Sequence, residues 1–226
     1  MARATKRETI INAFLDLLAE QSWEEISLAK IADKAGVKLS KLREKFDGKV
    51  AILEAFTRQI DAKVLDQIDA DVFDELPREQ LMDILLSRFD ALAPYKAASA
   101  TLVKAARRDL SLAAQLNRVT LVSMTWMLNG ANIDTSGING SLRAQGAALV
   151  FARVMSVWLN DDESLTKTMA ALDRELRRGE STLKRLDRAL GLFSPLARLA
   201  RTRRAKPSQF ADEAGDERFD KGTSLH

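Results

Sequence analysis

Residues 27–46 read SLAKIADKAGVKLSKLREKF, and they carry the clearest local structural signal of the chain. Ser27 is a favourable N-cap residue, and the apolar residues after it recur at the three- and four-residue spacing of one helix face. Gly36 can adopt the left-handed backbone conformation that ends a helix. A second short helix follows, with Leu42 and Phe46 on its apolar side. These residues therefore predict two short helices joined by a tight turn.

The second of these helices carries a cluster of positive charge. Its basic residues are Lys38, Lys41, Arg43 and Lys45. A short helix with one apolar side and a cationic, uncrowded opposite side is suited to enter the major groove of DNA. An ordinary helical hairpin with basic surface residues is the alternative that the pattern leaves open. The cations favour a helix-turn-helix.

The rest of the chain is predicted to form further helices with short breaks. Apolar and polar residues show no sustained alternation of the kind that indicates strands, and Gly and Pro are few. The expected helices are residues 4–21, 28–35, 39–45, 48–70, 78–92, 95–108, 110–130, 140–160, 163–179 and 182–203. We predict an all-α fold. It comprises an N-terminal three-helix helix-turn-helix domain (1–48), a larger C-terminal helical bundle (49–204) and a disordered tail (205–226).

Composition narrows the function classes. The 226 residues include no Cys and a single His, His226, which excludes disulfides and thiolate metal sites and nearly excludes imidazole-based catalysis. No phosphate-binding loop or paired-carboxylate motif is evident, so we expect neither an enzyme nor a metal or cofactor. Polar residues interrupt the first apolar stretch, and the apolar runs are too short or too charged to span a membrane. We expect a cytoplasmic protein without a signal peptide.

The N-terminal quarter of the chain also resembles a known family. The residues that carry the resemblance are the segment Leu28–Val37, followed by Leu42, Phe46, Lys49, Ile52 and Leu53. Over residues 5–56 they are similar to the DNA-binding domain of TetR-family transcriptional regulators. The resemblance implies an all-helical homodimer that binds a double-stranded DNA operator. It also implies a C-terminal domain that binds a small effector and supplies the dimer interface.

The same resemblance implies which residues contact DNA. They are Ser27, Lys38, Leu39, Ser40, Lys41, Arg43, Lys45 and Lys49. Ser27 and Lys49 are expected at phosphates, and residues 38–41 are expected to begin the recognition helix and lie nearest the bases. The chain departs from the family in residues 43–45, where two cations and a glutamate replace the usual aromatic phosphate contact. It departs again at Lys38, which stands in place of a serine N-cap.

The C-terminal helices contain many large, flexible apolar residues. Those predicted to line an effector pocket are Phe89, Met124, Met127, Phe151 and Trp158. A plain hydrophobic core is the alternative for such a set. The predicted dimer-interface residues, on helices 140–160 and 163–179, are Ala148, Phe151, Met155, Leu159, Met169 and Leu172. The alternative is that these apolar stripes are buried against their own domain.

Residues 183–204 form a basic amphipathic segment that Pro195 interrupts. It can pack as the last helix, lie on a membrane surface or touch DNA, and all three remain open at the level of sequence. Residues 157–174 resemble the coenzyme-Q biosynthesis lipid-binding proteins, which share the TetR fold, carry such a helix and have lost the DNA-reading helix.

The cations of residues 38–45 favour a regulator over a lipid-binding protein. We therefore predict a TetR-type repressor whose operator affinity is controlled by an unidentified small apolar or amphipathic effector. A membrane-associated lipid-binding protein of the TetR fold is the alternative.

Overall fold

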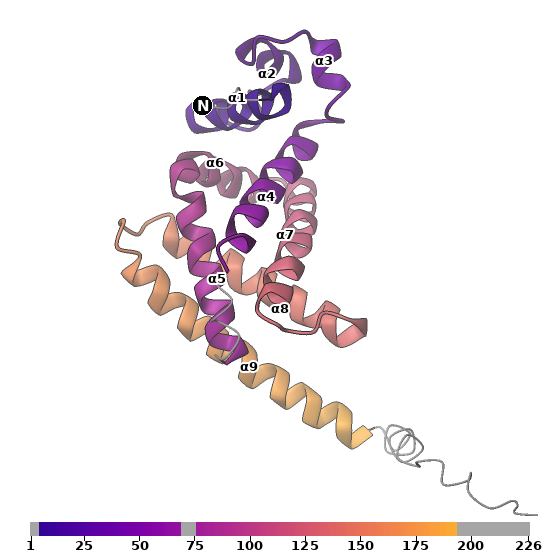
Figure 1. Ribbon diagram of the computed structural model, residues 1–226, viewed down its shortest axis with the longest axis vertical. Helices are drawn as coiled ribbons and strands as arrows, with labels where there is room; N and C mark the ends of the chain where they lie inside the picture. Colours follow the sequence, from indigo (N-terminus) through magenta and orange to yellow (C-terminus); the bar gives the residue numbers. More distant parts are fainter. Residues whose placement is uncertain (1–4, 69–75, 194–226) are drawn as a thin grey trace, which may run out of the picture. The chain divides into compact units, whose positions relative to one another are not determined.

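The computed structural model describes residues 5–68 and 76–193, and every regular element in those ranges is a helix (Figure 1). The elements are α1 (Lys6–Glu20), α2 (Leu28–Lys34), α3 (Leu39–Arg43), α4 (Lys49–Leu65), α5 (Pro77–Leu92), the 3-10 helix η2 (Ala93–Tyr95), α6 (Lys96–Ala106), α7 (Leu110–Gly130), α8 (Gly137–Trp158) and α9 (Thr166–Phe193). The predicted all-α class is confirmed. The chain divides into two units, Met1–Thr182 and Leu183–His226. The predicted tail, residues 205–226, lies outside the described residues.

Helices α1, α2 and α3 form the predicted three-helix arrangement. Thr5 begins α1 with a capping box, in which its hydroxyl accepts from the Glu8 N–H and the Glu8 carboxylate accepts from the Thr5 N–H. Ser27 caps α2 by accepting from the Lys30 N–H at 3.2 Å. Gly36, at a φ of +64°, turns the chain from α2 towards α3. The buried apolar residues of the three-helix arrangement include Ile10, Ile11, Phe14, Leu18, Ile26, Ile31, Leu42 and Phe46.

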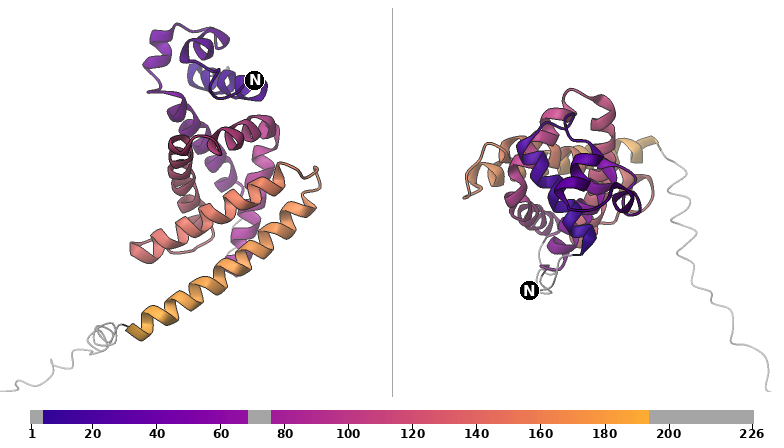
Figure 2. Two further views of the ribbon diagram at one scale, coloured as in Figure 1. Left: turned by 180° about the vertical axis from the view of Figure 1, so that it is seen from behind. Right: turned by 90° about the horizontal axis from the view of Figure 1, so that it is seen from above.

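The helices that follow extend the same hydrophobic core. Helix α4 packs against α1 near its start and against α5 and α7 further along, and α8 packs on α7. Figure 2 shows the same arrangement from behind and from above. The buried apolar residues of this part include Ile60, Val64, Leu85, Phe89, Met124, Met127, Leu128, Val154, Trp158 and Leu172. One continuous cluster therefore runs from α1 to the first part of α9.

Helix α8 and the first part of α9 run side by side in opposite directions (Figure 2). At the corner between them, the Asp161 carboxylate accepts from both the N–H and the hydroxyl of Thr168, each at 2.7 Å. Lys96 Nζ donates to the Asp161 carbonyl at 2.6 Å. Further along, Arg153 on α8 pairs with Glu175 on α9 at 3.0 Å. These bonds hold the start of α9 beside α8 and the start of α6. Within the described residues, no helix combines the length and apolar composition needed to cross a bilayer.

Helix α9 corrects the helix boundaries expected near the C-terminus. The sequence predicted two helices, 163–179 and 182–203, with a break after Gly179. Instead, α9 runs unbroken from Thr166 to Phe193, and Gly179 does not have a positive φ. Arginine, leucine and glutamate flank Gly179, so the penalty of about 1 kcal/mol for a helical glycine does not end the helix. Residues 194–203 lie outside the described range.

The two glycines Gly36 and Gly179 provide a matched test of these backbone assignments. A Cβ added at either one meets no atom within 4 Å, so only backbone conformation separates them. Gly36→Ala puts an alanine in the left-handed region, and we expect a loss of about 1–2 kcal/mol in unfolding free energy. Gly179→Ala places a better helix former inside α9, and we expect a gain of about 0.5–1 kcal/mol. Urea denaturation measures both; a loss of stability in Gly179→Ala would mean that the helix ends there.

Candidate functional site

Helix α3 exposes the residues that were predicted to contact DNA. Leu42 and Phe46 are only 1% and 4% exposed, and they hold α3 against the three-helix core. The opposite side of the helix and its flanks carry the exposed residues Lys38, Leu39, Ser40, Lys41, Arg43 and Lys45. Leu39 is the apolar member of this group and is 50% exposed. This surface, called the α3 face below, thus presents cations, a hydroxyl and one apolar side chain to solvent.

Two of the four cations on the α3 face are paired with nearby carboxylates. Lys41 Nζ lies 2.7 Å from Glu44 Oε1, and Arg43 pairs with Asp47. The hydrogen bond from Lys41 lowers the pKa of Glu44, which keeps this carboxyl group ionised at neutral pH. The other two cations, Lys38 and Lys45, form no ion pair with any described residue. Exposed pairs are weak and screened by salt, so Lys41 and Arg43 can exchange their carboxylate partners for phosphates. All four cations are therefore available to a polyanion.

Ser27 lies at the start of α2 and is exposed. Its Oγ already accepts the Lys30 N–H as the helix cap. A serine hydroxyl has one hydrogen to donate in addition to its lone pairs. Ser27 can therefore cap α2 and donate to a phosphate at the same time.

Lys49, predicted to contact a phosphate, is bonded within the protein. Its Nζ donates to the backbone carbonyls of Trp23 at 2.7 Å and Ile26 at 3.0 Å, and lies 4.1 Å from the centre of the Trp23 ring. Burial lowers the pKa of Lys49, and the nearby Glu24 carboxylate opposes that shift. Lys49 therefore joins the first turn of α4 to the loop between α1 and α2. The sequence analysis did not anticipate this contact; the available signal was Trp23, an aromatic residue four positions before the Ser27 cap.

The substitution Lys49→Met tests this internal role. It keeps the aliphatic stem but removes the ammonium group, which leaves the carbonyls of Trp23 and Ile26 without their donor. We expect the unfolding free energy to fall by about 2 kcal/mol in urea denaturation. Lys45→Met, at an exposed position without an ion pair to described residues, is the control and should change stability by less than about 0.5 kcal/mol. Equal effects of the two substitutions would contradict a structural role for Lys49.

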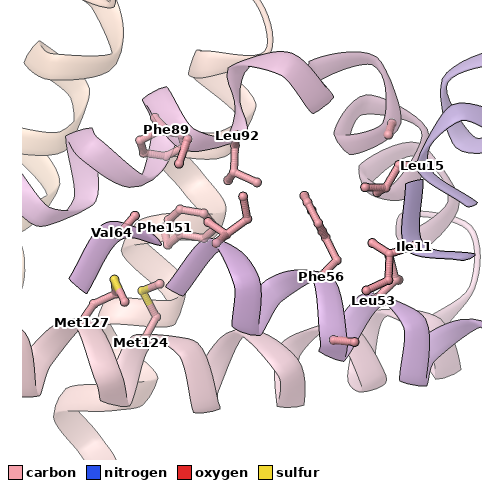
Figure 3. Close-up of a cluster of buried hydrophobic side chains, with 14 of the residues drawn as sticks. Ile11, Leu15, Leu53, Phe56, Val64, Phe89, Leu92, Met124, Met127 and Phe151 are labelled. Atoms are coloured by element: carbon pink, nitrogen blue, oxygen red, sulfur yellow. The ribbon is translucent and has the colours of Figure 1, made fainter. Parts of the chain in front are cut away.

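The five residues predicted to line an effector pocket lie together in the core between α5, α7 and α8. They are Phe89, Met124, Met127, Phe151 and Trp158, all of them buried. The Phe89 ring stacks on Phe151 at 5.0 Å between centroids and lies 5.5 Å from the Trp158 ring. Figure 3 shows Met124 and Met127 near the two phenylalanines, with Val64 of α4 beside them. In this conformation the rings contact one another, so any ligand at this place would have to displace side chains. The pocket stays a prediction.

Two surface hollows lie elsewhere, on either side of Trp23. One, of about 250 Å³, is lined by the end of α1 and the residues after it, by α6, including Lys104, and by Arg108 beyond the end of α6. The other, of about 470 Å³, is lined by the start of α4 and of α7, including Asp47 and Asp109. Both lie where the three-helix arrangement meets the following helices. None of the five predicted pocket residues lines either hollow.

A buried ion pair next to the five-residue cluster was not evident from the sequence. Arg88 on α5 pairs with Asp61 on α4, and the Ser123 hydroxyl on α7 donates to the same Asp61 oxygen at 2.7 Å. All three side chains are buried. The available signal was a charged residue within the apolar stripe of α4, between Ile60 and Val64. In the described part of the chain, no group of three or more metal-ligating side chains is arranged to hold a metal ion.

The structure divides the predicted dimer-interface residues into two groups. Ala148, Phe151 and Leu172 are buried within the chain itself as members of its hydrophobic core, where Phe151 stacks on Phe89 of α5. Met155 and Leu159 are half-buried, and Met169 is 46% exposed. The first three cannot form the outer surface of an interface. Three further apolar residues of α8 are exposed: Ile138, Leu142 and Leu149, the last two seven residues apart.

Comparison with known proteins identifies the fold. No protein-family model and no curated protein sequence matches the chain. Among solved structures, it is similar to a TetR transcriptional regulator from Nitrosomonas europaea, with 20% identity and a TM-score of 0.62 over 78% of this chain and 99% of that one. It is also similar to a TetR transcriptional regulator from Rhodococcus sp. RHA1, with 19% identity and a TM-score of 0.56 over 77% and 95% of the two chains.

A third similar structure is the fatty acid degradation regulator FadR from Bacillus halodurans, with 17% identity and a TM-score of 0.51 over 79% of this chain and 96% of that one. At these identities the likeness concerns the fold. The expected arrangement, an N-terminal helix-turn-helix followed by a larger helical part, is the arrangement of these proteins.

Proposed function

We propose that this chain, which has the fold of the TetR-family transcriptional regulators, is a DNA-binding transcriptional regulator. The observation that carries the proposal is the α3 face. Two buried apolar side chains anchor a short helix whose other side presents cations and no bulky apolar cluster. Such a helix fits the major groove, where it can reach base edges. The proposed action is repression, and no catalytic step is part of it.

The residues of the α3 face have distinct proposed roles. The residues proposed to lie nearest the bases are at the start of α3: Lys38, Ser40 and Lys41. The two lysines can donate hydrogen bonds to guanine, and the serine hydroxyl can contact a base edge. Leu39 is placed to meet a thymine methyl group. The remaining groups, Arg43, Lys45 and the Ser27 hydroxyl, are proposed to meet phosphates. Lys49 is proposed to act indirectly: its bonds to the loop before α2 fix the start of α4 relative to the start of α2.

We also propose that the chain works as a homodimer that contacts itself through α8 and α9. A twofold dimer places two α3 helices on the same side, as a palindromic operator with half-sites about 34 Å apart requires. Among the described side chains of these helices, the large exposed apolar residues are Ile138, Leu142, Leu149 and Met169. Exposed leucine and methionine on two adjacent antiparallel helices are suited to a four-helix contact.

A small apolar or amphipathic effector is proposed to control DNA binding through the five-residue cluster. The first residue of α4, Lys49, bonds to the loop before α2, and the far half of α4 contacts this part of the core through Val64 and Asp61. A ligand that repacks the cluster would therefore move α4 and change the placement of α3. The name of the similar Bacillus halodurans structure, a fatty acid degradation regulator, supports an apolar effector class.

Selection of DNA sequences from a random pool tests the regulator. We expect a palindromic consensus and an affinity that falls steeply with salt. Lys38→Ala should relax base preference in one half-site, whereas Lys45→Ala should weaken all sequences alike. Lys63→Ala is the control, because this exposed residue lies about 21 Å along α4 from Lys49 and should change neither property. If no sequence is enriched at moderate salt, the regulator is contradicted and the membrane-associated lipid-binding alternative is favoured.

The oligomeric state tests the dimer. We expect a dimer in sedimentation velocity at micromolar concentration. Leu149→Glu places two charges at the proposed contact and should weaken association by about tenfold or more. Leu110→Glu is the control, because Leu110 is an exposed leucine at the start of α7, outside the proposed contact. A monomeric wild-type protein, or equal effects of both substitutions, would contradict this interface.

A further inference from the structure

Arg88 is a charged side chain in the interior of the helices α4, α5, α7 and α8. It is 4% exposed, and Asp61, which pairs with its Nη1, is 5% exposed. Burial lowers the pKa of Arg88, and the Asp61 carboxylate opposes that shift. A buried ion pair contributes little net stability, because removing both charges from water cancels most of their attraction. The presence of this pair in an apolar core therefore points to a role beyond stability.

The hydrogen bonding of Arg88 is incomplete. Its Nε is buried and has no hydrogen-bond partner among the described residues. Asp61 engages Arg88 through Oδ1, and the Ser123 hydroxyl shares that same oxygen. A guanidinium presents its donors as forks that match the two oxygens of a carboxylate. Asp61 leaves the Nε side of the fork unused, which is the side that a second anion can take.

The surroundings of Arg88 are apolar. Its Cζ lies 5.3 Å from the centre of the Phe151 ring, which stacks on Phe89. Met124 and Met127 are fully buried in the same cluster, next to the two phenylalanines (Figure 3). Methionine side chains are flexible and repack around inserted groups more easily than branched residues. A molecule with one anionic group and an apolar body would match this combination of a single cation and a repackable apolar cluster.

We propose that Arg88 is the anion-binding residue of the effector site, and that the effector class is an amphipathic carboxylate. This inference rests on the proposed effector control. The carboxylate of the ligand takes the Nε side of the guanidinium, and its apolar body lies among Phe89, Phe151 and the two methionines. The added negative charge weakens the bond between Arg88 and Asp61. Because Asp61 belongs to α4, the loss of that bond releases α4 from α5.

Decanoate and its neutral counterpart decan-1-ol are suitable probes, since they share a chain and differ in the anionic group. We expect decanoate to raise the melting temperature, to bind in calorimetry and to weaken DNA binding by about tenfold. Decan-1-ol should do none of these. The aromatic acid 4-phenylbutyrate, with 4-phenylbutan-1-ol, repeats the comparison for a different apolar body.

Two variants assign the anion site to Arg88. Asp61→Asn removes the competing negative charge, and we expect it to bind decanoate about tenfold more tightly than the wild type. The double variant Asp61→Asn, Arg88→Met removes both charges, so no uncompensated buried charge prevents folding. It should remain folded and ignore decanoate. Because it lacks the bond between Arg88 and Asp61, its DNA binding should already be weaker than that of the wild type, and decanoate should not weaken it further. Ser111→Ala changes an exposed residue of α7 and is the control: it should bind decanoate as the wild type does.

Several outcomes would overturn the inference. If neither acid binds, if the alcohols act as strongly as the acids, or if the double variant binds decanoate as the wild type does, Arg88 is not the anion-binding residue. DNA binding of the ligand-free protein is a separate measurement. A protein that selects a DNA sequence but ignores both acids is a regulator without this site. A protein that binds decanoate through Arg88 but selects no sequence retains the site and contradicts the regulator.

Discussion

The packing of α4 against two different sets of helices is the constraint on which the rest of this structure depends. Near its start, Leu53 lies close to Ile11 and Leu15 of α1, and further along Val64 lies close to Phe89 and Met127 (Figure 3). A single apolar stripe thus serves both the helix-turn-helix and the following helices, in one continuous core. Protein interiors are close-packed, so they transmit a displacement rather than absorb it. A change at one end of α4 is therefore felt at the other.

Two lysines hold this arrangement by the same chemistry at two distant places. Lys49 lies over the Trp23 ring and donates to the Trp23 carbonyl, and Lys96 lies 5.3 Å from the centre of the Trp158 ring and donates to the Asp161 carbonyl. In each case an ammonium group ties the first turn of one helix to a loop beside an aromatic ring. Positive charge in this chain thus divides into an internal set, which joins helices, and the exposed set on the α3 face. Net charge alone does not separate the two, because burial decides which cations remain available to a polyanion.

Local sequence patterns were sufficient for the helices before α9, to within a few residues at their ends, and for the exposed side of α3. Ser27, Gly36, Leu42 and Phe46 act through contacts with near neighbours, so their spacing predicted both the turn and the exposed side of α3. The same reasoning failed at Gly179, because a glycine that ends one helix and a glycine inside another differ in φ rather than in residue type. At Gly179 the helix-forming neighbours outweigh the helix penalty of the glycine. Only the backbone conformation of α9 showed this.

The sequence by itself determined the all-helical class, the helix-turn-helix and the identity of the exposed cations, because these follow from periodicities of three to four residues and from capping. The tertiary structure alone decided that Lys49 bonds to a loop 23 residues before it, that Arg88 meets Asp61, and that Ala148, Phe151 and Leu172 are buried in their own chain. Each of these depends on which helix faces which, over separations of many residues. No local pattern carries that information, because an apolar or charged side chain has the same sequence neighbours whichever helix it packs against.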